Sequence, residues 1–437
     1  MNRSNINRTK LNSSNKCCVI GVLDNAMSGL PEAYQQKIQQ ADLIVAATRT
    51  INLFKNNFKK EAAIFDLTAK FIESVDVIKS ALKTEQQVIV LATGDPLCHG
   101  IGAFLVKKMG KDTIDILPNQ SMVQVAFSHL GESWQDAKIC SIHGADTKEW
   151  QIGSTPEHKL YTLLNNIKFN HLLAIYTSES NSPERIARML IMENMAKDFE
   201  FSIFEKLLQK EQKVTLNIDT KTVSKGKYAS PNLVVLKRKS KLNNPLLFGY
   251  DDNFYAMRKP EKGLITRADI RAVVLAKMQL KQNSIVWDIG AGSGSVGLEA
   301  AQLCQQGHIF AIEKNCDDLP LIEKNRQQMG LINYSIICGK APEIIDNWPS
   351  PNAVFIGGSS GNLENLIKLV LDKLTIGSSL VMNFITLENL THCLEILKSI
   401  SLDWNLTQMQ SSHSKPILHM NRLQADNLVW IVSTIKK

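Results

Sequence analysis

The stretch "WDIGAGSGSVGLEA" at residues 287–300 constrains the fold of this chain more than any other feature. An apolar run that contains an acid leads into three alternate glycines, and a pattern of small and apolar residues follows them. This order predicts a buried strand, a tight turn and a helix. Glycines let a backbone approach a ligand closely, and a helix start offers unpaired N–H groups. We therefore expect the turn to bind a cofactor in an α/β domain.

Two cofactors suit this turn. Gly290, Gly292 and Gly294 form the G-x-G-x-G of many S-adenosylmethionine (SAM) methyltransferases. Gly292, Gly294 and Gly297 form the G-x-G-x-x-G of a dinucleotide-binding fold. Glu313 ends the next apolar run, where an acid can accept hydrogen bonds from both ribose hydroxyls of either cofactor.

Further features favour SAM. Asp288 lies just before the glycines, where a carboxylate can bind the positively charged amino-acid end of SAM and would repel the pyrophosphate of NAD. Segments 404–410 and 427–435 have no predicted helix between them and are expected to form a final antiparallel pair. That pair suits the seven-stranded sheet of a methyltransferase better than a six-stranded dinucleotide fold. Thr266 and Arg267 lie just upstream of the sheet.

The second half alternates predicted strands with predicted helices. Thr266 is expected to cap its first helix, with Asp269 three residues later. The alternation predicts a Rossmann-like, doubly wound parallel sheet with an antiparallel edge. The strands are expected at 284–290, 308–313, 334–339, 352–358 and 379–385, and the helices at 266–280, 295–304, 317–329 and 361–374.

The first half has its own set of buried strands separated by helical periodicities. These strands are expected at 17–23, 41–47, 87–93, 112–117, 138–144, 171–177, 199–205 and 231–238. A polar stretch with two prolines and two glycines follows at 239–263. The expected organisation is a disordered tail at 1–16, a first domain at 17–240, a linker at 241–263 and a second domain at 264–437.

Composition restricts the class of protein. Of 437 residues, 44% are hydrophobic and 21% charged, which is ordinary for a globular chain with a large core, and no apolar run is long enough to span a membrane. The basic start has no apolar stretch, so we expect a tail rather than a signal or transit peptide. The net charge of +8 favours an anionic partner, either a nucleic acid or a polyacidic small molecule.

The cysteines and histidines point to no metal. The eight cysteines are scattered without C-x-x-C, so we expect neither a disulfide framework nor a zinc site, and a reducing cytoplasm fits best. Cys98 and His99 are interpreted as two loop residues rather than as metal ligands.

The second half resembles a known family. The ordered pieces "ITRADIRAVVLAKMQL", "VWDIGAGSGSVGLEAA", "IFAIEKN", "GKAPE" and "NAVFIGG" look like the decarboxylating methyltransferases that act on precorrins, the cobalamin precursors. "FIGGSSG" at 355–361 stands where nucleic-acid enzymes that methylate amino groups have a Pro-Pro-aromatic motif. In addition to Asp288, whose charge assigns it to the amino-acid end of SAM, the resemblance implies SAM contacts at Thr266, Gly290, Ala291, Gly292, Ser293, Gly294, Glu313 and Ala341. It also implies that Gly357, Gly358 and Ser359 face the tetrapyrrole.

The first half resembles the tetrapyrrole methylases, a separate SAM-binding fold with two small α/β lobes. "LATGDPLCHGIG" (91–102), "ILPNQSMVQVAFSHLGESWQDAKICSIHG" (116–144) and "YTSESNSPERIARML" (176–190) match its blocks in order. The sequence departs from the family at Leu23, at Asn119 and after Arg49. The resemblance implies SAM contacts at Gly94, Asp95, Pro96, Leu97 and Ser121.

Both families in this order resemble the bifunctional precorrin methyltransferases of cobalamin biosynthesis. The resemblance implies SAM-dependent methylation of carbons 5 and 15 with loss of a ring acetate carboxyl, from a metal-free or cobalt-containing substrate. No nucleic-acid or membrane partner is implied, and both families usually self-associate.

The substrate is a polycarboxylate, so basic residues near the second domain are candidates to bind it. At least one of Arg258, Lys259, Arg267 and Arg271 is expected to do so. Two other functions stay open at this point. An RNA methyltransferase would explain the charge and the SAM turn but not the first half. A non-catalytic tetrapyrrole-binding protein would retain only the folds.

Overall fold

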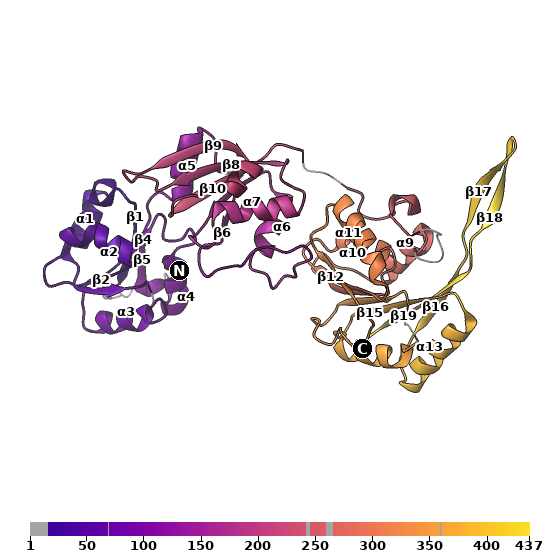
Figure 1. Cartoon of the computed structure of the whole chain (residues 1–437). Coiled ribbons are helices and arrows are strands. Elements are labelled where there is room, and N and C mark those ends of the chain that lie inside the picture. The colour runs from indigo at the N-terminus through magenta and orange to yellow at the C-terminus, as the bar shows by residue number, and fades with distance from the viewer. Residues whose placement is uncertain (1–15, 69, 242–244, 259–264, 359–360) are drawn as a thin grey trace, which may run out of the picture. The chain divides into compact units, whose positions relative to one another are not determined.

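The computed structural model describes residues 16–68, 70–241, 245–258, 265–358 and 361–437 (Figure 1). Its contacts divide the chain into two compact units. The first unit holds the residues up to 148 together with 170–188 and 196–240. The second unit holds 149–169, 189–195 and the residues from 241 on. The 1–15 part of the expected tail lies outside the described residues.

The first lobe of the first unit is a parallel sheet in the order β3-β2-β4-β1-β5. Alternate side chains of the inner strands enter two cores, one against α3 and α4 and one against α1 and α2 (Figure 1). The elements are β1 (Cys17–Val22), η1 (Ala26–Gly29), α1 (Glu32–Gln40), β2 (Leu43–Ala46), α2 (Thr48–Phe54), η2 (Lys55–Asn57), β3 (Ala63–Asp66), α3 (Ser74–Lys83), β4 (Val88–Thr93), α4 (Ile101–Met109), η3 (Lys111–Thr113) and β5 (Ile114–Leu117).

The second lobe is a mixed sheet in the order β6-β7-β10-β8-β9, in which only β6 and β7 are parallel. Helix α5 packs on this sheet through Val123, Ala126 and Phe127. The lobe contains α5 (Met122–Leu130), β6 (Lys138–Ser141), β7 (Leu172–Tyr176), β8 (Phe199–Glu205), β9 (Lys213–Asp219), α8 (Thr220–Lys225), β10 (Asn232–Arg238) and the first part of α7 (Pro183–Met192). The predicted two-lobed architecture is therefore confirmed.

The second unit is built on a seven-stranded sheet in the order β13-β12-β11-β14-β15-β19-β16. Its first five strands are parallel, and β19 pairs antiparallel with both β15 and β16, as the sequence predicts. The strands are β11 (Ile285–Ile289), β12 (His308–Glu313), β13 (Tyr334–Cys338), β14 (Ala353–Ile356), β15 (Ser379–Phe384), β16 (Asn405–Met409) and β19 (Val429–Ile435).

Helices cover both faces of this sheet (Figure 1). One core joins the sheet to α9, α10 and α11, and a second core joins the other face to α12 and α13. Neighbouring residues alternate between them, so Val286 enters the first core and Trp287 the second. The helices are α6 (Tyr161–Phe169), η4 (Asp252–Phe254), α9 (Ala268–Lys277), α10 (Ser295–Leu303), η5 (Cys316–Asp318), α11 (Leu319–Gln328), α12 (Leu363–Lys373) and α13 (Leu387–Ser399).

Three structural features were not predicted. The edge strands β3 and β9 are largely exposed, and an exposed hairpin of β17 (Ser412–Ile417) and β18 (Met420–Ala425) projects from the sheet between β16 and β19 (Figure 1). These strands lack the long apolar runs by which buried strands are recognised. Among the described residues, no helix combines the length and apolar character needed to cross a membrane.

Part of the expected linker belongs to the second unit. Tyr250 and Tyr255 are buried in its core, and residues 149–169 and 189–195 also group with it. Within this unit the Tyr161 hydroxyl contacts His308 Nδ1 at 2.8 Å, and Glu193 pairs with the buried Arg326 at 3.2 Å. Thr266 is not the N-cap that we expected, because α9 begins at Ala268.

Candidate functional site

The glycine turn of the second unit joins β11 to α10. Gly290, Gly292 and Gly294 all have positive φ, at 77°, 59° and 77°, which is the conformation that glycine tolerates best. The N–H groups of Gly290 and Ala291 donate to the carbonyl of Ile312 at 3.0 and 3.1 Å. The strand–turn–helix order that the sequence predicts is therefore present, with α10 almost wholly buried behind the turn.

Asp288 lies in β11 beside this turn and is 1% exposed. Its Oδ2 accepts a hydrogen bond from the Gly297 N–H at 3.1 Å, while Oδ1 has no hydrogen-bond partner among the described residues. Burial raises the pKa of Asp288 to about 7, which the Gly297 hydrogen bond opposes and the nearby Glu313 reinforces. A buried carboxylate with a free oxygen can bind an ammonium group.

Two more buried polar atoms next to the turn lack partners within the described part of the chain. They are the hydroxyls of Ser293 and Tyr334. A Cβ on Gly294 would lie 3.2 Å from the Tyr334 hydroxyl, so this hydroxyl is next to the turn. Burial raises the pKa of Tyr334 well above its usual value, so it is a hydrogen-bond donor. Unsatisfied buried groups at a glycine turn are what a polar cofactor would satisfy.

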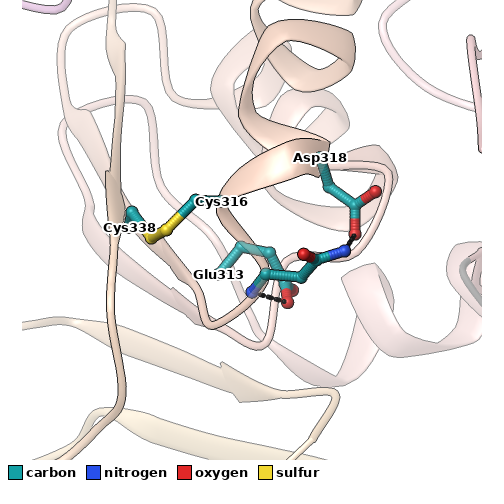
Figure 2. Close-up of a disulfide and its surroundings, with 5 residues drawn as sticks. Glu313, Cys316, Asp318 and Cys338 are labelled. Atoms are coloured by element: carbon teal, nitrogen blue, oxygen red, sulfur yellow. Dashed lines mark hydrogen bonds between the residues drawn. A yellow bond between two sulfur atoms is a disulfide. The ribbon is translucent and has the colours of Figure 1, made fainter.

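Glu313 ends β12 and is held by backbone amides (Figure 2). Its Oε2 accepts from the Gly292 N–H at 2.9 Å and its Oε1 from the Asn315 N–H at 3.0 Å. The Asn315 side chain in turn donates to Asp318 at 2.9 Å. The carboxylate is therefore fixed beside the turn, at the position where the sequence predicts that it binds the ribose of the cofactor.

The loop after Glu313 is also joined to β13 by a disulfide between Cys316 and Cys338, whose Cα atoms lie 5.2 Å apart (Figure 2). The expectation that the cysteines form no disulfide is therefore wrong for this pair. The two cysteines are 22 residues apart and meet only because β12 and β13 are neighbours, with Cys338 opposite Glu313. Local sequence spacing gives no sign of that pairing.

The loop after β14 reaches the same turn. A Cβ on Gly290 would lie 2.8 Å from the Gly358 nitrogen, and Gly357 donates to the Ile289 carbonyl at 2.9 Å. Ser359 lies outside the described residues. Ala341 is buried, and the nearby Gly339 N–H donates to the Glu313 carbonyl at 2.9 Å. The structure thus brings the turn, Glu313 and the predicted substrate loop together.

Arg271, which was predicted to bind substrate, makes its contacts inside the second unit in this structure. Its side chain is fully buried and donates to Glu299 at 2.7 Å, to Asp252 at 3.2 Å and to the Thr266 carbonyl at 2.6 Å. Glu299 also accepts from the N–H of Tyr250 at 3.2 Å. This buried pair attaches the segment before α9 to α10, a role that depends on desolvation and that no local pattern shows.

The other basic candidates differ in exposure. Arg267 is 58% exposed and lies 3.3 Å from Asp252, so it stays a candidate for substrate binding. Arg258 pairs with Asp318 at 3.3 Å. Lys259 lies outside the described residues.

Asn325, which sequence reasoning missed, is fully buried and donates to the carbonyls of Ala256 and Ser293 at 3.1 and 3.0 Å.

The first unit contains a cavity of about 680 Å³ between its two lobes. Thr93 and Cys98, on either side of the Gly94–Pro96 turn, line it from the first lobe, and Ser141, His143 and Tyr176 line it from the second. This volume is within the range of small-molecule sites.

Arg49 and Asp24 also line this cavity and were not among the predicted site residues. They form an ion pair at 2.6 Å, and Arg49 remains 44% exposed. An exposed guanidinium at a cavity can bind a carboxylate. The sequence contained no signal for this pair beyond the family block around Arg49.

The Gly94–Pro96 turn follows β4. Gly94 has φ of 73° and donates to the Val22 carbonyl at 2.7 Å. The Asp95 side chain accepts from the Leu97 N–H at 2.8 Å, and Leu97 itself is 54% exposed. Ser121 caps α5 through a reciprocal capping box with Gln124. Asp95 and Ser121 thus have structural roles here, and their contact with SAM stays a prediction.

Comparisons with known proteins cover both units. Residues 16–220 match the family model of the tetrapyrrole (corrin/porphyrin) methylases, and residues 260–436 match that of the precorrin methyltransferase domain. The chain is 25% identical over 373 residues to a precorrin-6Y C(5,15)-methyltransferase (decarboxylating) of Sinorhizobium, covering 84% of each protein.

Shorter relatives match as well. A cobalt-precorrin-6B C(15)-methyltransferase (decarboxylating) of Salmonella typhimurium is 36% identical over 174 residues, which are 40% of this chain and 90% of that protein. A crystal structure of precorrin-6Y C5,15-methyltransferase from Geobacter metallireducens has 35% identity, covers 44% of this chain and 99% of that chain, and gives a TM-score of 0.42.

The seven-stranded sheet, its glycine turn and the acid at the end of the next strand define the second unit as a Rossmann-like methyltransferase. The chain belongs to the family of the precorrin-6Y C5,15-methyltransferases (decarboxylating). The predicted fold class and enzyme class are confirmed. The relatives give no support to an RNA methyltransferase.

Proposed function

We propose that this chain uses SAM to methylate carbons 5 and 15 of a precorrin and removes the carboxyl group of a ring acetate as carbon dioxide. The first unit would serve carbon 5, and the second unit carbon 15 and the decarboxylation. The observation that carries this proposal is the presence of two different folds in one chain, each with a positive-φ glycine turn at the end of a parallel strand.

In the second unit the residues present fit SAM. Asp288 would bind the ammonium group of SAM with its unpaired oxygen, and Glu313 would bind the ribose. The 290–294 turn would contact the part of SAM that lies between these two groups. Thr266 and Ala341 are further contacts implied by the family resemblance. When bound, SAM supplies a methyl group activated by its sulfonium. The task of this chain is then to align the reacting carbon and exclude water, which contributes about 7–11 kcal/mol in well-oriented systems.

In the first unit we propose Gly94, Asp95, Pro96, Leu97 and Ser121 as the corresponding SAM contacts. Arg49 is positioned to bind a substrate carboxylate at the cavity. In the second unit, Gly357 and Gly358 would face the macrocycle, and the exposed Arg267 would bind one of its acid side chains.

We also propose that the chain self-associates, which size-exclusion chromatography with light scattering would test.

The decisive experiment is mass spectrometry of the product that the full chain forms from precorrin-6Y and SAM. Two added methyl groups and one lost carbon dioxide are expected per substrate. Gly94→Ala should remove the carbon-5 methyl alone, because alanine is strained at this φ. Glu313→Gln should weaken the carbon-15 methylation. If either variant lowered both methylations equally under single-turnover conditions, the assignment of one carbon to each unit would be wrong.

A further inference from the structure

His143 is one of the residues that line the cavity of the first unit, and the hydrogen bond of its ring determines which nitrogen carries the proton. Its Nδ1 lies 3.0 Å from the carbonyl oxygen of Thr177. A carbonyl oxygen only accepts hydrogen bonds, so Nδ1 carries the hydrogen. In the neutral ring Nε2 then has the free lone pair. His143, at the wall of the cavity, therefore has a proton acceptor in a fixed tautomer.

The loop that carries His143 is held firmly. Asn181 is fully buried, and its Nδ2 donates to the carbonyls of Ile142 at 2.8 Å and Ala145 at 3.2 Å, on either side of the histidine. Its Oδ1 accepts from the Thr147 N–H at 2.9 Å. This extent of support is typical of a group that must be oriented for chemistry.

The carbonyl that orients the ring is itself fixed. Thr177 follows β7, and its hydroxyl donates to the Asn232 carbonyl in β10 at 2.7 Å. His143 follows β6, which pairs parallel with β7, so the two residues leave the same end of the sheet. The register of β6 and β7 therefore brings the ring and its acceptor together.

The other titratable groups that line the cavity in the described residues contact one another. Asp24 is paired with Arg49. Burial, followed by the nearby Cys98, raises the pKa of Tyr176, so its hydroxyl stays protonated. The thiol of Cys98 lies 3.7 Å from that hydroxyl. The ring of His99 packs edge-on against Tyr176, with centroids 6.0 Å apart.

Methylation of carbon 5 requires such an acceptor. Carbon 5 is a bridging carbon that carries one hydrogen within a conjugated system. A π electron pair of the macrocycle forms the new carbon–methyl bond, and the pair of the broken methyl–sulfur bond stays on sulfur. Carbon 5 then holds both hydrogen and methyl, and the macrocycle has gained one positive charge. Loss of the hydrogen as a proton returns the C–H electron pair to the ring and restores conjugation.

We infer that His143 is the general base that takes this proton on Nε2, an inference that rests on the proposed assignment of carbon 5 to the first unit. General bases contribute about 10²–10⁴-fold to such steps. His143→Gln in the full chain should therefore slow carbon-5 methylation at least about 100-fold. In His143→Gln, the rates of carbon-15 methylation and of carbon dioxide release should equal those of Gly94→Ala, the variant that also lacks carbon-5 methylation. His171→Gln, an exposed histidine of the same unit outside the cavity, is the matched control.

Two readouts separate a base from a structural residue. Nitrogen-15 NMR of the full chain without SAM should show neutral His143 as the Nδ1–H tautomer. Calorimetry should show that His143→Gln binds SAM with the wild-type stoichiometry and affinity. Added imidazole should restore carbon-5 methylation to His143→Ala but not to Gly94→Ala, because a cavity left by the ring can admit a soluble base.

The outcomes distinguish this inference from the function on which it rests. If Gly94→Ala kept its carbon-5 methylation, the assignment of carbon 5 to the first unit would be wrong. If Gly94→Ala lost it while His143→Gln stayed within about threefold of wild type, well below the contribution of a general base, only the inference would be overturned. Loss of SAM binding in His143→Gln, or an Nε2–H tautomer, would overturn it as well.

Discussion

Asp288 Oδ2 and the backbone N–H of Gly297 are 3.1 Å apart, and this contact joins β11 to the first turn of α10. Glycine is required at 297, because a Cβ there would overlap the same carboxylate oxygen and lie 2.8 Å from the ring of Tyr334. The close approach leaves the second oxygen of Asp288 free beside the cofactor turn. One glycine therefore determines both the packing of α10 and the accessibility of the carboxylate.

Gly297→Ala should destabilise the second unit by about 1–3 kcal/mol, the usual cost of overfilling a packed site. It should also weaken SAM binding there, because the Asp288 carboxylate must move. Urea denaturation and calorimetry would measure the two effects. In the double variant with Asp288→Ala, the loss of stability should be smaller than the sum of the single losses. Strict additivity would mean that the two residues do not interact.

SAM binding to the second unit should release a proton below about pH 7. Burial raises the pKa of Asp288 to about 7, so below this pH its carboxyl is protonated in the free protein. The ammonium group of SAM favours the carboxylate, so affinity should rise with pH and level off above 7. Calorimetry of Gly94→Ala in buffers of different ionisation enthalpy would isolate this site. Asp288→Asn should abolish the proton release, and release that persisted would exclude Asp288 as its source.

The same carboxyl should make folding stability depend on pH. The folded state raises the pKa of Asp288 from 3.8 to about 7, so it holds the proton more tightly than the unfolded chain. This contribution is fully present below about pH 4 and is lost as the pH rises through about 7. Asparagine does not titrate, so the stability of Asp288→Asn relative to wild type should increase as the pH rises from about 4 to above 7 in denaturation curves. A constant difference at every pH would contradict the assignment.

Arg271→Ala should cost about 3–5 kcal/mol of stability, because it leaves Glu299 buried without its positive partner. Arg267→Ala is the matched control, since Arg267 also pairs with Asp252 but is 58% exposed. Its loss should cost less than about 1 kcal/mol. Chemical denaturation measures both. Equal effects on stability would show that burial does not distinguish the two arginines.

Replacing Cys316 and Cys338 with alanine should lower stability by about 2–4 kcal/mol relative to the oxidised protein. It should also weaken SAM binding at the second unit, because Asn315, which donates to Glu313, directly precedes Cys316 in the chain. A dithiol reductant should reproduce both effects in the wild type and change nothing further in the double variant. An additional effect of the reductant on the double variant would point to another cysteine.

Much of the local structure was predictable from the sequence. The strand–turn–helix at 287–300 was recognisable because three glycines follow a buried apolar run, and Glu313 because it ends the next run. The closing antiparallel pair followed from the absence of a helix between its strands. Buried parallel strands can be recognised in the sequence by their continuous hydrophobic runs. The exposed strands β3, β9, β17 and β18 have no such runs and could not be recognised in this way.

The sequence by itself determined the order of the buried strands and of the helices between them, because these depend on backbone freedom and on hydrophobic periods along the chain. The two-lobed fold of the first unit was implied by its family resemblance. Only the tertiary structure decided that Arg271 is buried rather than exposed to substrate, that Cys316 meets Cys338, and that the Thr177 carbonyl orients His143. Each of these depends on which strands are neighbours and which groups lose water. Those relations join residues far apart in sequence, so no local pattern encodes them.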